Sequence, residues 1–232
     1  MIAYGSDILA SLDKMNGRGP CAIIVRHAAR YPITDLKRSL EVGLTEEGMN
    51  DAFRFGSSLG AFSHVRFFHS PALRCRQTAE CMMRGLGGNG VSASLTGPEH
   101  NLCAPYMKDE SCLAVAARSG KGFIREWFEG LLDRDWILPT GPAADMVMAP
   151  IIERLRDPEG EGRLDVHVSH DWEISLLREE LFGLRYEDTG WPPYMDGILF
   201  RADGARFCAA YNSHEAPLSM VNGRRARATD NP

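Results

Sequence analysis

The sequence predicts a three-layer α/β/α sandwich with a mainly parallel central sheet and a helical cap inserted over one edge. Apolar runs of strand length alternate with segments of helical periodicity, which is the pattern of parallel sheets covered by helices on both faces. The first run, at 22–26, is apolar up to its last residue, as expected of a strand buried on both sides. From about 98 to 162 the alternation breaks, because Gly and Pro there separate three short helical patterns.

The strands and helices before the break have clear boundary signals. After the first strand, "LTEEGMNDAFRFGSSLGAF" predicts a helix with Thr45 as its N-cap, two glutamates in its first turn, and apolar residues at helical spacing. Those apolar residues are Met49, Ala52, Phe53, Leu59 and Phe62. "VRFFHS" predicts the second strand, and "SPALRCRQTAECMMRGLGG" a helix with Ser70 as N-cap and Pro71 at its first position. "VSASL", at 91–95, predicts a third strand.

The second half continues the pattern after the predicted cap at 98–162. Cap helices are expected around 112–117, 123–132 and 143–156. "RLDVHVSH" predicts the fourth strand, followed by the helix "DWEISLLREELFG", which Gly183 closes. "GILFRADGARFCAAY" alternates about an Asp-Gly pair and predicts a β-hairpin. We expect one domain over 1–232, with a polar tail from about 217 to 232.

Composition excludes several classes of protein. With 232 residues and a net charge of −5, the chain has no basic surface for nucleic acid. The N-terminal segment lacks the pattern of a secretory signal, and no apolar run has the length of a membrane span. None of the six cysteines forms a CxxC pair, and the histidines show no metal-ligand spacing. These features predict free thiols, a cytoplasmic location, and no metal.

Cationic and imidazole side chains follow three of the predicted strands. Arg26 and His27 close the first strand, Arg74 lies in the helical turn after the second, and His170 follows the fourth. In a parallel sheet, ligands bind at the carboxyl ends of the strands, so these side chains are expected to meet there. An imidazole beside permanently charged guanidinium groups is discouraged from taking a proton and stays available as a nucleophile.

Such a cluster suits the chemistry of a phosphate monoester. Guanidinium forks match phosphate oxygens and remain charged, so Arg26, Arg30 and Arg74 are candidates for a phosphate cradle. The N-terminus of the helix after the second strand adds its positive dipole end. His27 is the candidate nucleophile that carries the phosphoryl group, and His170 the candidate donor to an equatorial oxygen. An acid must then protonate the leaving alkoxide.

Four motifs resemble those of the histidine phosphatase superfamily, in the same order. "VRHAARYP" resembles its Arg-His-Gly motif, in the extended form of the histidine acid phosphatase branch, and "LTEEG", "SPALRCRQTAE" and "VSHDWEI" resemble the later motifs. "PPYMDGILF" also resembles a segment of that branch. The resemblance spans about 21–200 except the predicted cap, and it implies a phosphoglycerate mutase-like fold closest to the acid phosphatase branch.

The resemblance implies roles for the cluster. His27 would be the nucleophile, with a phosphate pocket made of Arg26, Arg74, His170 and the additional arginine Arg30. Asp171 matches the general acid of the acid phosphatase branch. Glu99 lies about where the mutase-like branch places its glutamate, so it is an alternative general acid. Ala28 replaces the motif's glycine, a departure expected to shift the loop only slightly.

The leading functional prediction is a phosphomonoesterase that hydrolyses a small phosphorylated metabolite through a phosphohistidine, without metal or cofactor. A phosphomutase, a phosphoprotein phosphatase and a non-enzymatic phospho-ligand-binding module are the alternatives. No nucleic-acid or membrane partner is expected, and no residue pattern specifies the oligomeric state. Specificity is expected to depend on the insert and on residues 33–43.

Overall fold

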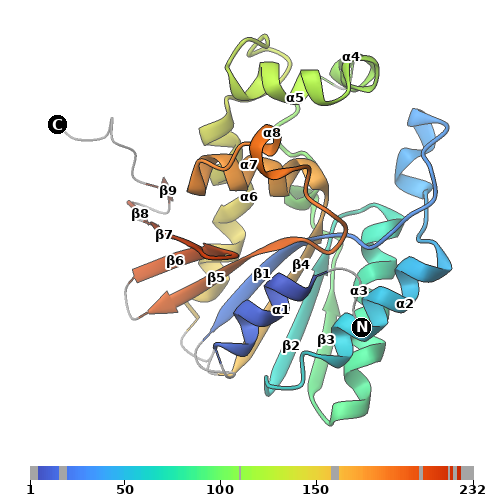
Figure 1. Ribbon diagram of the computed structural model, residues 1–232, viewed down its shortest axis with the longest axis vertical. Helices are drawn as coiled ribbons and strands as arrows, with labels where there is room; N and C mark the ends of the chain where they lie inside the picture. The colour runs from blue at the N-terminus through green and yellow to red at the C-terminus, as the bar shows by residue number, and fades with distance from the viewer. Residues whose placement is uncertain are drawn as a thin grey trace.

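A seven-stranded sheet in the order β3-β2-β4-β1-β5-β6-β7 forms the centre of the protein (Figure 1). The computed structural model describes residues 5–15, 20–109, 111–157, 162–203, 206–218, 220–221 and 224–225. Its parallel strands are β1 (Cys21–Arg26), β2 (His64–His69), β3 (Ser92–Thr96) and β4 (Arg163–Ser169). Antiparallel pairings add β5 (Gly197–Asp203), β6 (Arg206–Tyr211) and β7 (His214–Leu218). The predicted α/β fold is confirmed.

Helices cover both faces of this sheet. One face carries α1 (Ser6–Asp13), α2 (Glu46–Ser57) and α3 (Leu73–Leu86), and the other carries α6 (Thr140–Leu155) and α7 (Asp171–Phe182). Alternate residues of β1 point into opposite cores: Ile23 and Val25 pack with the first set of helices, and Ile24 packs with the second. Every residue of β1 is buried, which explains the continuous apolar run in the sequence.

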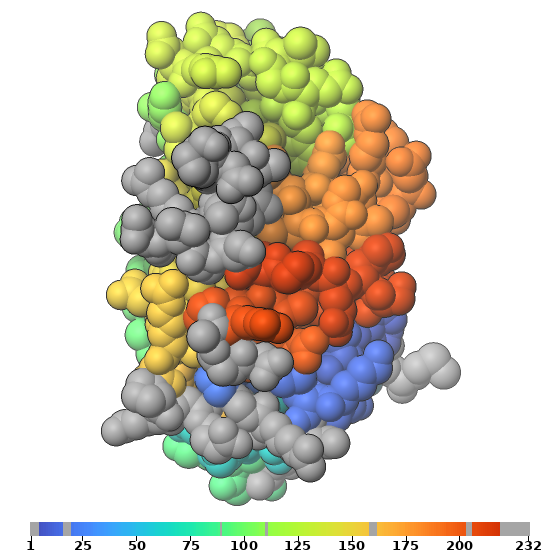
Figure 2. All heavy atoms as spheres, turned by 90° about the vertical axis from the view of Figure 1, so that its left-hand side faces the viewer, coloured from blue at the N-terminus to red at the C-terminus, as the bar shows by residue number. Residues whose placement is uncertain are grey.

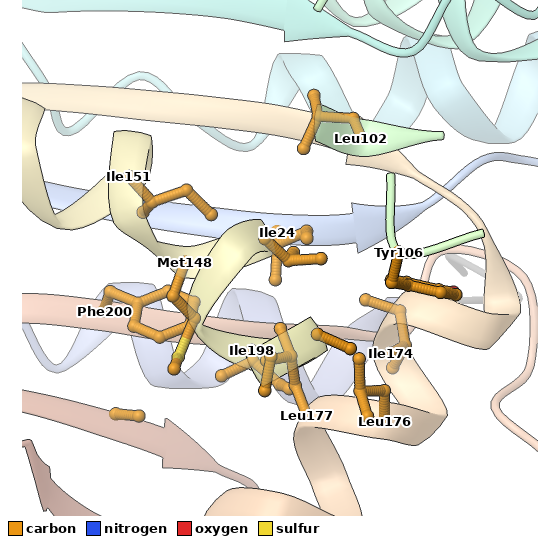
Figure 3. Close-up of a cluster of buried hydrophobic side chains, with 14 of the residues drawn as sticks. Ile24, Leu102, Tyr106, Met148, Ile151, Ile174, Leu176, Leu177, Ile198 and Phe200 are labelled. Atoms are coloured by element: carbon orange, nitrogen blue, oxygen red, sulfur yellow. The ribbon is translucent and has the colours of Figure 1, made fainter. Parts of the chain in front are cut away.

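The core beneath α6 and α7 joins the two halves of the chain (Figure 3). Ile24 from β1 and Phe200 from β5 lie beside Met148 and Ile151 of α6, and Ile174 and its neighbours on α7 close the cluster (Figure 3). These side chains are almost completely buried. At about 25 cal/mol for each Å² of apolar surface removed from water, such burial is a main source of stability.

Two predicted helix boundaries are confirmed and two are wrong. The Thr45 hydroxyl accepts the Gly48 N–H at 3.0 Å as the N-cap of α2, and Gly183 ends α7 in the left-handed conformation at φ 68°. In contrast, α3 begins at Leu73 after an Ala72 N-cap, so neither Ser70 nor Pro71 has its predicted place. The α2 helix ends at Ser57, although the predicted helix continued to Phe62. Its buried aromatic residue is Phe55, whereas Phe53, which was predicted on the apolar face, is 46% exposed.

The predicted cap contains α4 (Ser111–Ser119) and α5 (Lys121–Phe128), which lie at the top of Figure 1, beyond α7, and form the yellow-green top of the molecule in Figure 2. Arg125 of α5 forms ion pairs with Glu179 of α7 at 2.7 Å and with Glu187 of α8 (Tyr186–Thr189) at 2.5 Å. The third predicted cap helix, α6, packs on the sheet as part of the outer layer. A separate cap therefore stays a prediction for the segment that precedes α6.

The C-terminal part contains more strand than predicted. The expected hairpin is present as the antiparallel pair β5 and β6. Residues 204–205 between these strands, which include the glycine of the Asp-Gly pair, lie outside the described residues. A polar tail was predicted from about 217, but residues 217–218 belong to β7. After β7, β8 (Met220–Val221) pairs with β9 (Arg224–Arg225). Short 3₁₀ segments are η1 (Leu36–Glu41), which is kinked at Arg38, η2 (Gly87–Asn89) and η3 (His100–Leu102). No helix among the described residues is long and apolar enough to cross a membrane.

Candidate active site

The parallel strands bring Arg26, His27 and His170 to one edge of the sheet. Arg26, the last residue of β1, is in register with Ser169, the last residue of β4. The His27 N–H then donates to the Ser169 carbonyl at 3.0 Å, which holds the two strand ends together. The rings of His27 and His170 meet edge to face with centroids 5.5 Å apart. Because both strands run in the same direction, the predicted juxtaposition is realised.

The hydrogen bonds of His27 define which ring nitrogen is free. Its Nδ1 lies 2.8 Å from the Ala28 carbonyl, and a carbonyl can only accept, so Nδ1 carries the hydrogen. Nε2 therefore keeps its lone pair, and it accepts a hydrogen bond from Arg74 Nε at 3.2 Å. The ring is only 2% exposed. An unprotonated nitrogen is thus held beside a guanidinium group.

Burial and charge keep His27 neutral. The pKa of its imidazole is lowered to about 3, first because the ring is buried and then because Arg74 and Arg26 repel a second positive charge. The hydrogen bond to Ala28 and the carboxylate of Asp171 oppose that shift without cancelling it. At neutral pH the imidazole has its nucleophilic form.

Ala28, where the family motif has glycine, is accommodated without a left-handed backbone. Its φ angle is not positive, and the residue is completely buried. Its N–H donates to the Thr78 hydroxyl at 3.1 Å, and that hydroxyl donates to the Arg74 carbonyl at 2.7 Å. The loop that carries His27 is therefore fastened to the helix that carries Arg74.

Arg74 connects the two histidines. It is the second residue of α3, and its Nη2 donates to His170 Nδ1 at 3.1 Å while its Nε donates to His27. Its Nη1 donates to the Ser39 carbonyl at 2.7 Å. By contrast, Arg76 is exposed and pairs with Glu80 at 2.7 Å, because two positions further along the helix a side chain points to a different face.

His170 is also neutral. Its Nδ1 accepts from Arg74, so the hydrogen is on Nε2, which donates to the Ser70 hydroxyl at 2.7 Å. The pKa of this imidazole is far below its ordinary range, because the ring is buried and because Arg74, His27 and Arg26 surround it. Donation from Nδ1 to a phosphate would require a proton, which the negative charge of a bound dianion favours.

Arg26 lies between a loop and a carboxylate. Its Nη1 donates to the Pro192 carbonyl at 2.5 Å, and its Nη2 pairs with Asp171 Oδ2 at 2.9 Å. The Tyr194 ring lies 4.4 Å from the guanidinium carbon, within the range of a cation–π contact. The Pro-Pro-Tyr segment that the sequence singled out therefore forms one wall of the cluster.

The two candidate acids have different surroundings. Asp171, the first residue of α7, receives the Trp191 indole N–H at 3.1 Å on the same Oδ2 atom that pairs with Arg26. Glu99 instead receives hydrogen bonds from Arg154 of α6 on both carboxylate oxygens. The structure thus joins Asp171 to the Arg26–His27 cluster and joins Glu99 to Arg154.

Arg30 contributes charge to the cluster. Its Nη1 donates to the Tyr31 carbonyl at 2.8 Å, and its positive charge lowers the pKa of both Arg74 and His170. Two acids that follow it in the sequence have other partners: Asp35 accepts the Lys37 N–H, and Glu41 pairs with Arg38. The role of Arg30 as a phosphate ligand stays a prediction.

Sequence reasoning missed several residues around the cluster. Ser70 was interpreted as a helix cap, but its hydroxyl meets His170, and the backbone carbonyl of Ser39 fixes Arg74. Trp191 and Glu173 were not singled out. Only Ser70 carried a usable signal, since it follows a strand that ends at the same edge. Within the described residues, no three His, Cys, Asp or Glu side chains are grouped to hold a metal ion. All six cysteines are free.

Glu173 is a buried acid in the same turn of α7 as Asp171. Its Oε1 accepts the Ala104 N–H at 2.6 Å and the Tyr106 hydroxyl at 3.3 Å, which fastens the segment after η3 to α7. The pKa of Glu173 is raised from 4.5 to about 7, mainly by burial and also by the nearby charge of Asp171, against the hydrogen bonds that the carboxyl group accepts.

The raised pKa of Glu173 predicts a pH-dependent loss of stability. Below pH 4.5 both folded and unfolded chains hold the proton, and the group has no effect on stability. Between 4.5 and 7 the unfolded chain releases a proton that the folded chain keeps, so stability falls as pH rises. From pH 4 to 8, we expect Glu173→Gln to gain roughly 3 kcal/mol relative to the parent protein.

Urea unfolding of both proteins at several pH values measures this difference. Glutamine keeps an oxygen for the Ala104 N–H and the Tyr106 hydroxyl, so the comparison isolates the ionisation of residue 173. A difference in unfolding free energy that stays constant from pH 4 to 8 would contradict the prediction.

Comparison with known proteins agrees with this fold and these motifs. Residues 22–94, from β1 to β3, match the family model described as histidine phosphatase superfamily (branch 1). The superfamily resemblance is confirmed, while the closer relation to the acid phosphatase branch stays a prediction. None of the curated proteins compared with the chain matches it by sequence.

Solved structures share the fold at low sequence identity. A mycobacterial glucosyl-3-phosphoglycerate phosphatase in its native form is 15% identical, with a TM-score of 0.57 over 85% of this chain and 100% of its own. Its complex with inorganic phosphate gives 16% and 0.54 over 84% and 98%. YhfR of Bacillus stearothermophilus is 18% identical, with a TM-score of 0.53 over 89% and 98%. At these identities the likeness shows the fold alone.

Proposed function

We propose that the chain is a member of the histidine phosphatase superfamily, whose family model matches residues 22–94, and that it is a phosphomonoesterase acting through a phosphohistidine on His27. One observation carries the proposal: the unprotonated Nε2 of His27 lies 3.2 Å from Arg74 Nε, in a cluster that also contains Arg26 and His170. A neutral nucleophile among cations suits a substrate that brings its own negative charge.

In the first step, a phosphate monoester replaces contacts that the protein now makes with itself. Arg74 Nε and Nη2, which donate to the two imidazoles, turn to phosphate oxygens, and Arg26 lies within the same cluster. His27 Nε2 forms a bond to phosphorus as the bond from phosphorus to the ester oxygen breaks. The leaving alkoxide takes a proton from Asp171, and the phosphoryl group stays on His27.

In the second step, water releases the phosphoryl group. The Asp171 carboxylate accepts a proton from water, the water oxygen bonds to phosphorus, and the bond from phosphorus to Nε2 breaks. Inorganic phosphate leaves, and Asp171 and His27 return to their starting protonation states. The nucleophile, the acid and the base of the proposed cycle are all side chains of this protein, and the cycle as we propose it uses no metal or cofactor.

The substrate that we propose is a small phosphorylated metabolite. The names of two structural neighbours, a phosphatase for glucosyl-3-phosphoglycerate and its complex with inorganic phosphate, support hydrolysis of such a compound. The segment with α4 and α5 lies beyond the sheet edge, tied to α7 by Arg125. Lys121 of α5 lies 5.4 Å from the ring centroid of Trp191, which contacts Asp171, so this segment borders the proposed site. A site with such a neighbour suits a small substrate better than a phosphoprotein.

A panel of phosphorylated metabolites tests the proposal. We expect inorganic phosphate to be released from at least one small monoester, in the presence or absence of EDTA, without accumulation of an isomeric phosphate ester. An isomerised product without phosphate release would establish a phosphomutase instead. Activity confined to phosphoproteins, or tight phosphate-ester binding without turnover, would overturn the metabolite phosphatase assignment.

A further inference from the structure

The loop between α8 and β5 touches both partners of the Arg26–Asp171 ion pair. The Gly190 carbonyl accepts from buried Arg178 at 3.2 Å, which fixes the start of the loop. The next residue, Trp191, donates its indole N–H to Asp171 at 3.1 Å, and Pro192 offers its carbonyl to Arg26 at 2.5 Å. Consecutive residues of one loop thus hold an acid and the cation beside it.

Both contacts that the structure gives the Asp171 carboxylate fall on Oδ2. Arg26 Nη2 lies 2.9 Å from this atom and Trp191 Nε1 lies 3.1 Å from it. An oxygen that accepts two such donors has its lone pairs engaged, so Oδ1 is the oxygen left to carry a proton when Asp171 acts as an acid.

The Trp191 ring is held from two other elements. The Tyr186 ring of α8 meets it edge to face, with centroids 5.2 Å apart, and the Lys121 ammonium of α5 lies 5.4 Å from its centroid. The Tyr186 hydroxyl donates to the Lys121 carbonyl at 2.7 Å, so these two supports are themselves joined. An indole restrained in this way aims its N–H in a fixed direction.

We infer that Trp191 is a positioning residue for proton transfer, which fixes the Asp171 carboxyl group with Oδ1 turned to the leaving group. The inference rests on the proposed function, because Trp191 acts only through Asp171, the proposed general acid. Arg26 alone could hold Oδ2 at one point, but a second donor at an angle to the first fixes the rotation of the carboxyl plane. Trp191 also links the acid to α5 of the predicted cap.

The test compares Trp191→Phe with the parent protein on two kinds of ester. Phenylalanine keeps an aromatic ring beside Tyr186 and Lys121, while the indole N–H is lost together with part of the ring system. For alkyl phosphates, whose leaving group needs a proton, we expect kcat/KM to fall roughly tenfold to a hundredfold, the size of one hydrogen bond to a charged group. For an activated aryl phosphate such as p-nitrophenyl phosphate, we expect a change of less than about threefold.

A double-mutant cycle separates positioning from a general structural effect. In the Asp171→Asn background, Trp191→Phe should cost nothing more on alkyl phosphates, because its effect passes through the acid. Trp172→Phe is the matched control, since Trp172 stacks on Phe123 and not on the site, and it should keep the parent activity on both ester types. Thermal unfolding of each variant confirms that it is folded.

The outcomes are distinct. A loss that is equal for both ester types, additive with Asp171→Asn, or absent would overturn the role of Trp191. If Asp171→Asn itself left alkyl ester hydrolysis intact, the proposed acid would be wrong, and the role of Trp191 would fall with it.

Discussion

His27→Ala is expected to abolish phosphatase activity while the protein stays folded. The reaction loses His27 Nε2, the proposed nucleophilic atom, whose lone pair lies beside Arg74. Removal of a covalent nucleophile lowers kcat by roughly a millionfold in comparable systems, because the other groups cannot replace the bond that it forms. Activity on p-nitrophenyl phosphate, measured over hours at high enzyme concentration, reports the loss.

A second measurement ties that loss to chemistry. Mixing the parent protein with substrate and quenching in base should trap a phosphoryl group on a peptide that contains residue 27, and the variant should trap none. His27→Gln keeps most of the side-chain volume and controls for a cavity. His64→Ala is the matched control on β2, where the ring contacts the Ser92 hydroxyl and not the site. Retention of substantial activity in His27→Ala would show that another residue is the nucleophile.

The pH dependence of that activity has a definite sign. Because the pKa of His27 is lowered to about 3, deprotonation of the nucleophile in the free enzyme is complete well below pH 6. The lone pair is therefore present throughout the neutral range, and any change of kcat/KM there comes from another group or from the second ionisation of the substrate.

The fold was predictable where the signal was local. The apolar run of β1, the Thr45 cap and the Gly183 helix end each depend on residues adjacent in sequence, and each agrees with the structure. The start of α3 differs from the prediction, because the Ser70 hydroxyl, which suited a helix cap, contacts His170, a residue 100 positions away. A tertiary contact outweighed a local preference.

The site was predictable to the extent that strand ends determine it. Arg26, His27 and His170 meet because β1 and β4 are parallel neighbours. The alternation of strands and helices predicted the parallel sheet, whereas this strand order is seen in the structure. Trp191 and Glu173 have no such signal, since one lies in an irregular loop and the other is buried by a segment whose path the sequence does not reveal.

The pairing of Glu99 with Arg154 bears on the choice of general acid. Both Glu99 oxygens receive hydrogen bonds from one guanidinium group on α6, and this bidentate contact holds the carboxylate in a fixed position beside Arg154. Asp171, in contrast, contacts Arg26, whose neighbour in sequence is the nucleophile. We therefore keep Asp171 as the proposed acid, and the difference leads to the second large effect.

Asp171→Asn is expected to slow the hydrolysis of esters according to how strongly their leaving group needs a proton. Asparagine keeps an oxygen for Arg26 and Trp191 but has no proton to donate as an acid. For alkyl phosphates we expect kcat/KM to fall roughly a hundredfold to ten-thousandfold, the usual contribution of general acid catalysis, and for p-nitrophenyl phosphate less than about tenfold.

The measured quantity is the slope of log kcat/KM against the pKa of the leaving alcohol, which reports only steps up to departure of that alcohol. The slope should become steeper in Asp171→Asn, and the release of p-nitrophenol should acquire a burst, because water attack on phosphohistidine also loses its base. Glu99→Gln, which alters the pair with Arg154, should leave the slope unchanged. A steeper slope in Glu99→Gln with a normal slope in Asp171→Asn would assign the proton to Glu99, and the carboxyl held by Arg26 and Trp191 would then serve only to orient the cations around the phosphate.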